Sequence, residues 1–173
     1  MQRLLLAFGA AVAAAAFTPL AGAVGSYDQV VGAGTRATDD SSQIVNRFAV
    51  QAFDGPSGVS GFYNVHPEGN PSATRRVDIK CTYVAGSRAV VGGIIVDAPN
   101  PDLIGIGFAI AFEDNGNPQG GVTPDRVSSN DFFTEPGRTP PLTQADCAAE
   151  AASGIFNTFH PMASGDIQIY DAP

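Results

Sequence analysis

The sequence predicts an all-β protein: about eight antiparallel strands, arranged as a meander-type barrel or a sandwich, with one short helix near the C-terminus. Turn-forming residues recur throughout the 173 residues, among them 20 glycines and 13 prolines. The short runs between these turns alternate apolar and polar side chains, as expected of strands with one buried face. Tight turns between consecutive strands favour a meander, but this pattern does not separate a barrel from a sandwich.

Residues 1–23 are expected to form a cleavable signal peptide. One positive charge precedes an apolar run over residues 4–20, and the segment ends in Ala-Gly-Ala, the small-x-small pattern that signal peptidase accepts. A transmembrane helix or a buried core helix is the alternative, but this run is shorter than the roughly 20 apolar residues of a span, is rich in alanine and contains Pro19. Cleavage after Ala23 would leave residues 24–173 as a single β domain, secreted to the medium or to a periplasm.

The charge of the chain argues against nucleic acid as a partner. The net charge is -8, Lys80 is the only lysine, and the arginines are scattered apart from the pair Arg75 and Arg76. Binding to a nucleic-acid backbone requires a cationic stripe that displaces condensed counterions. No second long apolar segment follows the signal peptide, so we expect the mature chain not to be embedded in a membrane.

Three strands are expected at the start of the domain, over residues 27–34, 44–53 and 59–65. The last two flank Asp-Gly-Pro-Ser-Gly at residues 54–58, which is typical of a hairpin loop. The clearest alternation follows at residues 76–84 and predicts a half-buried antiparallel strand. One face of this strand would carry Val77, Ile79, Cys81 and Tyr83, and the other Asp78, Lys80 and Thr82.

The second half of the domain continues the strand pattern. A run rich in Val and Ile at residues 89–97 predicts a strand, and Gly92-Gly93 in its middle indicates a bulge or a bend. The remaining strands are expected over residues 104–113, 126–133 and 166–170. 

One segment departs from this pattern and predicts a short helix. Thr143 is followed three positions later by Asp146, as in a capping box, and the alanine-rich run after them ends at Gly154. Cys147 would lie in this helix. A disulfide with Cys81, the other cysteine of the chain, would then join the helix to a strand.

The cysteines predict a disulfide because an even count in an exported chain usually means a bridge. Two buried free thiols are the alternative. Neither Cys81 nor Cys147 belongs to a CxxC pair or has a histidine nearby in sequence, so we expect no catalytic or metal-binding role for them. 

No residue pattern predicts a catalytic, cofactor-binding or metal site. His66 and His160 each precede a proline and are expected in loops at strand ends, and no serine lies in a G-x-S-x-G elbow. A carbohydrate-active enzyme would need two carboxyl groups about 5 to 9.5 Å apart, contributed by different strands. The candidate carboxylates are Asp97, Glu113, Asp114, Asp125 and Asp131.

The loop between Asp114 and Asp125 has two interpretations. Oxygen-rich turns can bind calcium, but the spacing here does not match D-x-[DN]-x-[DN]-G, because Gly116 is third and the next acid is far downstream. Asn-Gly readily supplies the positive φ of a tight turn. We therefore expect a structural turn, with calcium binding as the alternative.

Three segments together resemble a widespread group of uncharacterised exported bacterial β proteins. They are VDIKCTYVAGSRAVVGGIIV at residues 77–96, FEDNGNPQGGVTPDRVS at 112–128 and SGDIQIYDA at 164–172. The shared features are a Cys-bearing strand, a Gly-Gly strand, a "DNG…PDR" loop and a terminal "GnIqV" strand. This chain differs by a longer insert at residues 137–152. The resemblance implies export, a β fold and the cysteine pair, and it supplies no activity.

These observations predict a secreted or cell-envelope accessory protein that binds an unknown extracellular ligand or protein and is not an enzyme. Two alternatives remain at this point. One is a carbohydrate-active enzyme that uses paired carboxylates. The other is a carrier that holds a small apolar ligand inside a barrel of about eight strands.

Overall fold

The computed structural model describes residues 27–37, 45–116, 123–129, 131–133 and 142–172; the expected signal peptide lies outside them. Within this part of the chain there are nine strands, one α-helix and two single turns of 3-10 helix, at Pro71–Ala73 and Pro101–Leu103. The strands and the helix are β1 (Asp28–Ala37), β2 (Val45–Gly55), β3 (Gly58–Pro67), β4 (Arg75–Ala85), β5 (Arg88–Asp97), β6 (Gly107–Glu113), β7 (Arg126–Ser128), β8 (Asp131–Phe133), α1 (Gln144–Ser153) and β9 (Phe159–Tyr170).

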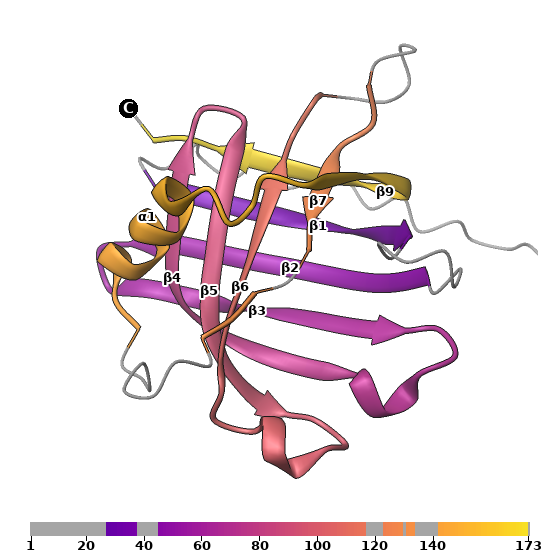
Figure 1. Cartoon of the computed structure of the whole chain (residues 1–173). Coiled ribbons are helices and arrows are strands. Elements are labelled where there is room, and N and C mark those ends of the chain that lie inside the picture. The colour runs from indigo at the N-terminus through magenta and orange to yellow at the C-terminus, as the bar shows by residue number, and fades with distance from the viewer. Residues whose placement is uncertain (1–26, 38–44, 117–122, 130, 134–141, 173) are drawn as a thin grey trace, which may run out of the picture.

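The strands close into an eight-stranded antiparallel barrel (Figure 1). Strands β1 to β6 follow one another around the wall as a meander, and β9 completes the ring between β1 and β7. The eighth position in the wall is divided, because β7 pairs with the end of β6 at Phe112 and Glu113 while β8 pairs with its start at residues 107–109. The predicted fold class is therefore confirmed, and the barrel is distinguished from the sandwich.

Most strand boundaries match the sequence predictions, with three differences. The expected loop at residues 54–58 is a two-residue turn, since Gly55 pairs with Gly58, whose φ is 93°. The expected strand at residues 126–133 is the two short strands β7 and β8. Strand β9 begins at Phe159, before the expected residue 166, and passes through a register irregularity opposite Thr35 and Arg36 that interrupts its alternation.

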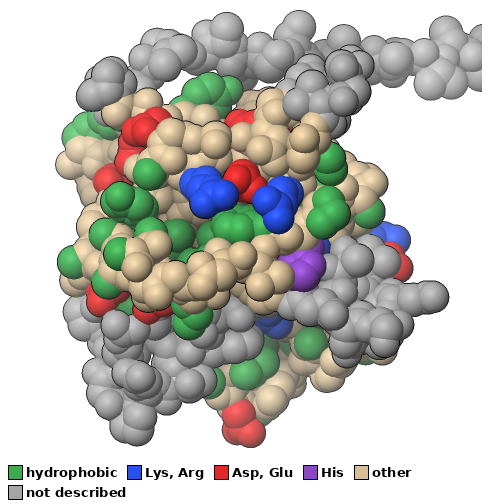
Figure 2. Space-filling view, turned by 45° about the horizontal axis from the view of Figure 1, so that its top comes forward, with side chains coloured by type: hydrophobic (Ala, Val, Ile, Leu, Met, Phe, Trp, Pro, Cys, Tyr) green, Lys and Arg blue, Asp and Glu red, His purple; other side chains and the backbone are tan. Residues whose placement is uncertain are grey.

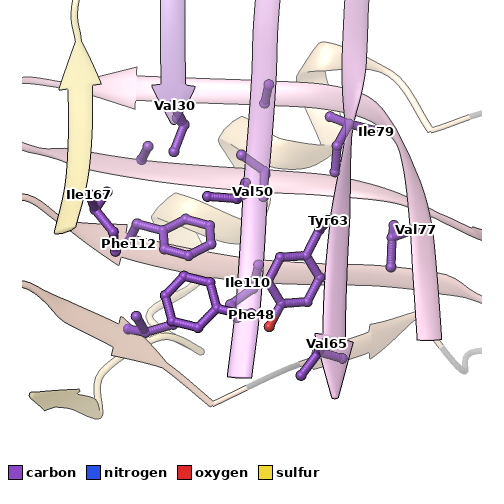
Figure 3. Close-up of a cluster of buried hydrophobic side chains, with 14 of the residues drawn as sticks. Val30, Phe48, Val50, Tyr63, Val65, Val77, Ile79, Ile110, Phe112 and Ile167 are labelled. Carbon is purple, nitrogen blue, oxygen red and sulfur yellow. The ribbon is translucent and has the colours of Figure 1, made fainter. Parts of the chain in front are cut away.

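The core of the barrel is made of the inward-facing side chains of all its long strands (Figure 3). Four aromatic rings fill its middle. The ring centroids of Tyr63 and Phe108 are 5.2 Å apart, those of Phe48 and Phe112 are 6.0 Å apart, and Tyr63 also lies 6.3 Å from Phe112. Rings at these separations pack favourably in addition to the surface that they bury. The other large side chains that are almost fully buried are aliphatic: Val30, Val50, Val65, Ile79, Val77, Val91, Ile95, Ile110, Val127 and Ile167.

A β-bulge at Lys80 corrects the predicted faces of β4. Ile79 pairs with Gly93 and Cys81 pairs with Gly92, so two steps along β4 match one step along β5. A bulge of this kind reverses the alternation of side chains beyond it. Ile79 therefore faces the core, whereas Cys81 faces outward in a separate cluster with the helix.

The same bulge explains the burial of the next residues in β4. Tyr83, predicted to be buried, is 40 % exposed, while Thr82, predicted on the outer face, is buried. The glycine pair in β5 does indicate a bulge, but the extra residue belongs to the neighbouring strand. A Cβ at Gly93 would lie 2.2 Å from the carbonyl oxygen of Asp78, so glycine allows the close approach of the two strands.

Candidate functional site

The predicted helix is present as α1, and local contacts define both of its ends. The Asp146 carboxylate accepts hydrogen bonds from the backbone N–H of Thr143 at 2.6 Å and from its hydroxyl at 2.8 Å. The helix ends at Gly154, whose φ of 75° is the left-handed conformation of a glycine cap. Both signals were visible in the sequence, and both operate as expected.

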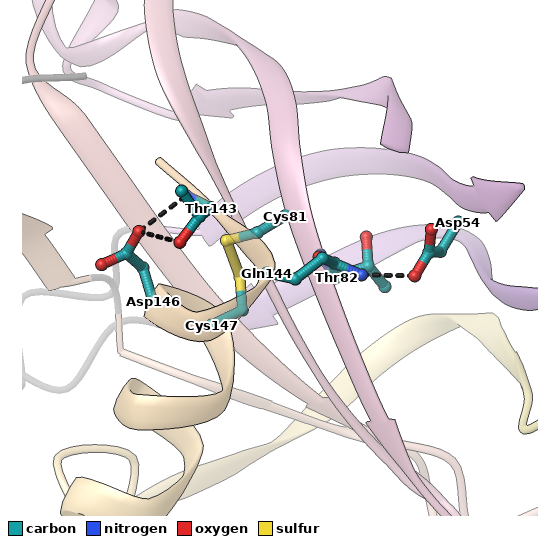
Figure 4. The surroundings of a disulfide bond; sticks show 7 residues. All are labelled: Asp54, Cys81, Thr82, Thr143, Gln144, Asp146 and Cys147. Carbon is teal, nitrogen blue, oxygen red and sulfur yellow. Dashed lines mark hydrogen bonds between the residues drawn. A yellow bond between two sulfur atoms is a disulfide. The ribbon is translucent and has the colours of Figure 1, made fainter. Parts of the chain in front are cut away.

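Helix α1 lies on the outside of the barrel against β4 and β5 (Figure 1), and a disulfide attaches it there (Figure 4). Cys147 of the helix is bonded to Cys81 of β4, with their Cα atoms 5.8 Å apart. Both cysteines are fully buried. The predicted pairing is thus present, and the bulge at Lys80 makes it possible by directing Cys81 outward.

A glutamine reinforces this attachment. The side-chain oxygen of Gln144 accepts a hydrogen bond of 2.8 Å from the backbone N–H of Thr82, and its amide nitrogen donates to the Asp54 carboxylate. The first turn of α1 is therefore tied to two strands, while the disulfide anchors the next residues.

A groove of about 340 Å³ opens between the remainder of α1 and the outer face of the sheet. It exists because the helix presents alanines here, which are too short to fill the space above Val90 and Ala111. The lining residues are Tyr83, Ala85, Arg88, Ala89, Val90, Ala111, Ala148, Ala151, Ala152, Gly154, Phe156, Asn157 and Phe159. We call this recess the α1 groove; most of its side chains are apolar.

Three charged residues form a cluster at the edge of the α1 groove. Arg88 donates from Nε and Nη2 to one oxygen of Glu113, at 3.0 and 2.8 Å, and Arg126 donates from Nη1 to the other oxygen at 3.0 Å. Glu113 is thus bound on both sides. Antiparallel pairing brings the three residues together, because Arg88 and Arg126 lie directly opposite Glu113 in β5 and β7.

Phe159 supports both guanidinium groups. The Cζ atoms of Arg88 and Arg126 lie 5.4 and 5.6 Å from the centre of its ring, within the range of a cation–π contact. Arg126 also donates from Nη2 to the backbone carbonyl of Phe159 at 3.0 Å. These contacts fix the orientation of both cations.

The exposed charge of this cluster is positive. The Glu113 side chain is 11 % exposed, whereas those of Arg88 and Arg126 are 61 % and 37 % exposed. Figure 2 shows this face, with two basic side chains on either side of an acidic one and hydrophobic side chains beside them. A chain with a net charge of -8 therefore displays a local cationic site next to an apolar recess.

Asp114 and Asp125, the two aspartates of the DNG…PDR loop, accept hydrogen bonds from the backbone. The two oxygens of Asp125 accept hydrogen bonds from the backbone N–H groups of Asn115 and Ile167, at 2.9 and 2.8 Å. Asp114 accepts from the N–H groups of Gly116 and Ile169. Burial raises the pKa of Asp125, while these two backbone hydrogen bonds act in the opposite direction. The two aspartates tie the loop to the end of β9.

Of the other candidate acids, Asp97 and Glu113 lie at opposite ends of the barrel wall. Asp97 lies at the end of β5 and pairs with Arg76, whereas Glu113 lies opposite Arg88 at the beginning of the same strand. The side chain of Asp131 lies outside the described part of the molecule, as does the middle of the DNG loop. Among the residues described, no group of three or more His, Cys, Asp or Glu side chains is placed to bind a metal ion.

Both histidines lie within strands, which corrects their expected position in loops. His66 pairs with Arg47 near the end of β3, and His160 pairs with Val127 near the start of β9. His66 also lines a second recess with Asn64, Thr74, Arg75, Arg76, Asp97, Ala98 and Pro99. Pro67 is the last residue of β3 and Pro161 the third residue of β9, and proline is tolerated near strand ends.

The interior of the barrel is occupied by its own side chains, including polar groups. Arg36 donates to the carbonyl of Ser128 at 2.8 Å, and the Arg75 guanidinium lies 5.3 Å from the centre of the Phe108 ring. Burial raises the pKa of Tyr63 to about 12, and the positive charges of Arg75 and Arg36 oppose this rise. 

Sequence reasoning did not single out Arg88, Arg126 or Phe159. In the sequence, Arg126 stands out only as part of the DNG…PDR loop, and Glu113 only as one of several candidate acids. The one available signal is that Arg88 directly precedes the predicted strand at residues 89–97 and Glu113 ends the next one, at 104–113, so that a hairpin would place them opposite each other. Phe159 gave no signal because its strand was predicted to begin later.

No family model, curated protein or solved structure matches this chain. No helix among the described residues is long and apolar enough to cross a membrane. 

Proposed function

We propose that the protein is an exported, non-enzymatic binding domain and that it binds its ligand in the α1 groove. The α1 groove itself carries the proposal: an apolar recess lies outside the barrel, and ordered guanidinium groups stand at its edge. Its volume of about 340 Å³ falls in the range of roughly 300 to 1,000 Å³ that is usual for small-molecule sites.

Export is supported by the disulfide and by the N-terminal sequence pattern. Disulfides persist mainly in oxidising compartments outside the cytoplasm, and this one joins the helix that forms one wall of the α1 groove. Mass spectrometry of protein recovered from the medium or periplasm should give a chain that begins at residue 24. An intact N-terminus on protein found only in the cytosol would contradict export.

The two alternatives have less support from the described residues. Of the acids proposed for a carbohydrate-active enzyme, Asp114 and Asp125 bind backbone N–H groups and Glu113 forms ion pairs. For a carrier, a ligand inside the barrel would have to displace packed rings such as Tyr63 and Phe108. The α1 groove requires no such displacement.

Binding of an uncharged fluorescent dye, Nile red, tests the α1 groove directly. The oxidised protein should bind one dye molecule saturably. Ala148→Leu would extend a side chain into the α1 groove and should weaken dye binding at least ten-fold. Ala149→Leu is the matched control, because Ala149 is exposed on the same helix and does not line the α1 groove.

Leucine and alanine are both good helix formers, so neither variant should unfold α1. Circular dichroism and thermal melting would verify this. Equal dye affinities for the two variants, or no saturable binding to the wild-type protein, would overturn the proposal.

A further inference from the structure

We propose that the α1 groove selects an amphipathic monoanion, whose apolar chain lies along the alanine surface of α1 and whose carboxylate binds at Arg88. This inference rests on the proposed function and names the ligand class of the same site. Its basis is the arrangement of Arg88, Glu113, Arg126 and Phe159 at the edge of the α1 groove.

The charges of the cluster leave room for one additional negative group. Two arginines and one glutamate give a local charge of +1, and the glutamate is the least exposed of the three. A monoanionic ligand would bring the cluster to neutrality. A multiply charged anion or an anionic membrane surface would instead meet the net charge of -8 of the whole chain.

Arg88 has unused donors that can bind such a group. A guanidinium carries five N–H donors, and Arg88 uses Nε and Nη2 to bind Glu113. In the described residues Nη1 has no assigned acceptor, and the side chain is 61 % exposed while also lining the α1 groove. Carboxylates are natural partners for this geometry, because a guanidinium can bind one through two parallel hydrogen bonds.

Glu113 and Phe159 hold Arg88 in place before a ligand arrives. The carboxylate fixes two of its nitrogen atoms, and the ring of Phe159 lies 5.4 Å from its Cζ atom. Ordering a free arginine on binding would cost conformational entropy, and this cost is reduced when the side chain is already held. Two acids beside the β4–β5 turn are bound elsewhere: Asp171 accepts from the N–H of Gly86, and Asp114 accepts from those of Gly116 and Ile169.

The floor of the α1 groove sets the nature of the rest of the ligand. Val90 and Ala111 of the sheet and Ala148 and Ala151 of the helix offer aliphatic contacts, and Phe156 adds an aromatic one. Burial of methylene groups against such surfaces is favourable by the hydrophobic effect. The limited volume favours a short or medium-length chain over a long one.

Calorimetric titration at low ionic strength with octanoate, 1-octanol and octylammonium tests this inference, because the three probes share a chain and differ in charge. Octanoate should bind in a 1:1 complex at least ten-fold tighter than 1-octanol, and octylammonium should bind most weakly. Arg88→Gln should bring the affinity for octanoate within two-fold of that for 1-octanol. Arg76→Gln, an exposed arginine outside the α1 groove, should keep the full preference.

The outcomes separate the two proposals. Equal binding of octanoate and 1-octanol, or an unchanged preference in Arg88→Gln, would overturn the monoanion while leaving the α1 groove as a binding site supported by Nile red. If neither Nile red nor any of the three probes binds, both proposals fail. Thermal melting of Arg88→Gln should show a folded protein, since Arg126 remains paired with Glu113.

Discussion

Gly92 lies directly opposite Cys81 in the β4–β5 pair, and it is the absence of a side chain there that leaves space for the disulfide. A Cβ at Gly92 would lie 2.7 Å from the Sγ of Cys81 and 3.0 Å from that of Cys147. Both distances are too short for a carbon next to a bonded sulfur. The glycine, the bulge at Lys80 and the disulfide are therefore parts of one arrangement.

Gly92→Ala should destabilise the oxidised protein by about 1 to 3 kcal/mol, the usual cost of inserting a methyl group into a packed site. Urea unfolding measures this cost. Gly55→Ala is a suitable control, because a Cβ at Gly55 would meet no atom within 4 Å.

Gly92→Ala can also be introduced into a variant in which both cysteines are changed to alanine. The sulfur atoms that the new methyl group would meet are then absent, so most of the destabilisation should disappear. An equal cost in both backgrounds would show that the close contact with the sulfur atoms is not its cause.

Removal of the disulfide by Cys81→Ala with Cys147→Ala should reduce stability by up to about 4 kcal/mol. The two cysteines are 66 residues apart, and a loop of that length constrains the unfolded chain by about this amount. Denaturant unfolding of the oxidised wild-type protein and the double variant gives the difference.

Loss of the disulfide should reduce the local stability of α1 more than that of the barrel. In the described part of the chain, four buried residues, two of them the cysteines, form the cluster between the helix and the sheet. Amide hydrogen exchange should accelerate in α1 while the core strands β2 and β3 stay protected. Uniform acceleration across the whole barrel would contradict this account.

Glu113→Gln should destabilise the protein by about 2 kcal/mol, because it removes charge-assisted hydrogen bonds to two guanidinium groups and leaves those cations beside each other. Added salt should recover part of the loss. Thermal melting at several salt concentrations measures both effects.

The exposed pair between Arg47 and Glu68 offers the matched comparison. Glu68→Gln should change stability by no more than about 0.5 kcal/mol, since both side chains are well solvated. If Glu113→Gln and Glu68→Gln changed stability equally, the burial of Glu113 would not strengthen its ion pairs.

The free energy of unfolding of the wild-type protein should fall, relative to that of Asp125→Asn, as the pH rises. Burial raises the pKa of this carboxyl in the folded protein above its ordinary value of 3.8. The folded state therefore binds the proton more tightly than the unfolded state, and this contribution is complete below pH 3.8 and is lost as the pH rises through the folded pKa.

Urea unfolding of both proteins between about pH 3 and pH 6 gives the difference in free energy, in which the contributions of acids that do not interact with Asp125 cancel. A carbon-13 titration of the Asp125 carboxyl provides the midpoint independently. A midpoint below 3.8, or a difference that grows with pH in favour of the wild-type protein, would contradict the assigned direction.

Much of the barrel could be predicted from the sequence because its signals are local. Alternation over residues 76–84 and turn residues such as those at 54–58 depend on neighbouring positions, and so does the helix between Thr143 and Gly154. The barrel itself depends on which distant edges pair, and the pairing of β9 with β1 leaves no local pattern.

The bulge and the charge cluster show why the rest could not be predicted. Nothing in the residues around Lys80 indicates that alternation is interrupted there, and one extra residue is enough to exchange the faces of Cys81 and Tyr83. The charged cluster joins β5, β6 and β7. Phe159, the ring beside both arginines, lies in a part of β9 that does not alternate. Contacts of this kind become visible only when the register is known.

Nuclear magnetic resonance titration of the nitrogen-15-labelled, oxidised protein with octanoate tests the central claim most directly. The account predicts saturable shifts in the side-chain Nε–H of Arg88 and in the backbone amides of Ala148 and Ala151, with those of Val50 and Tyr63 in the barrel interior unchanged. Shifts concentrated in the interior strands, or no saturable shift at Arg88, would contradict it.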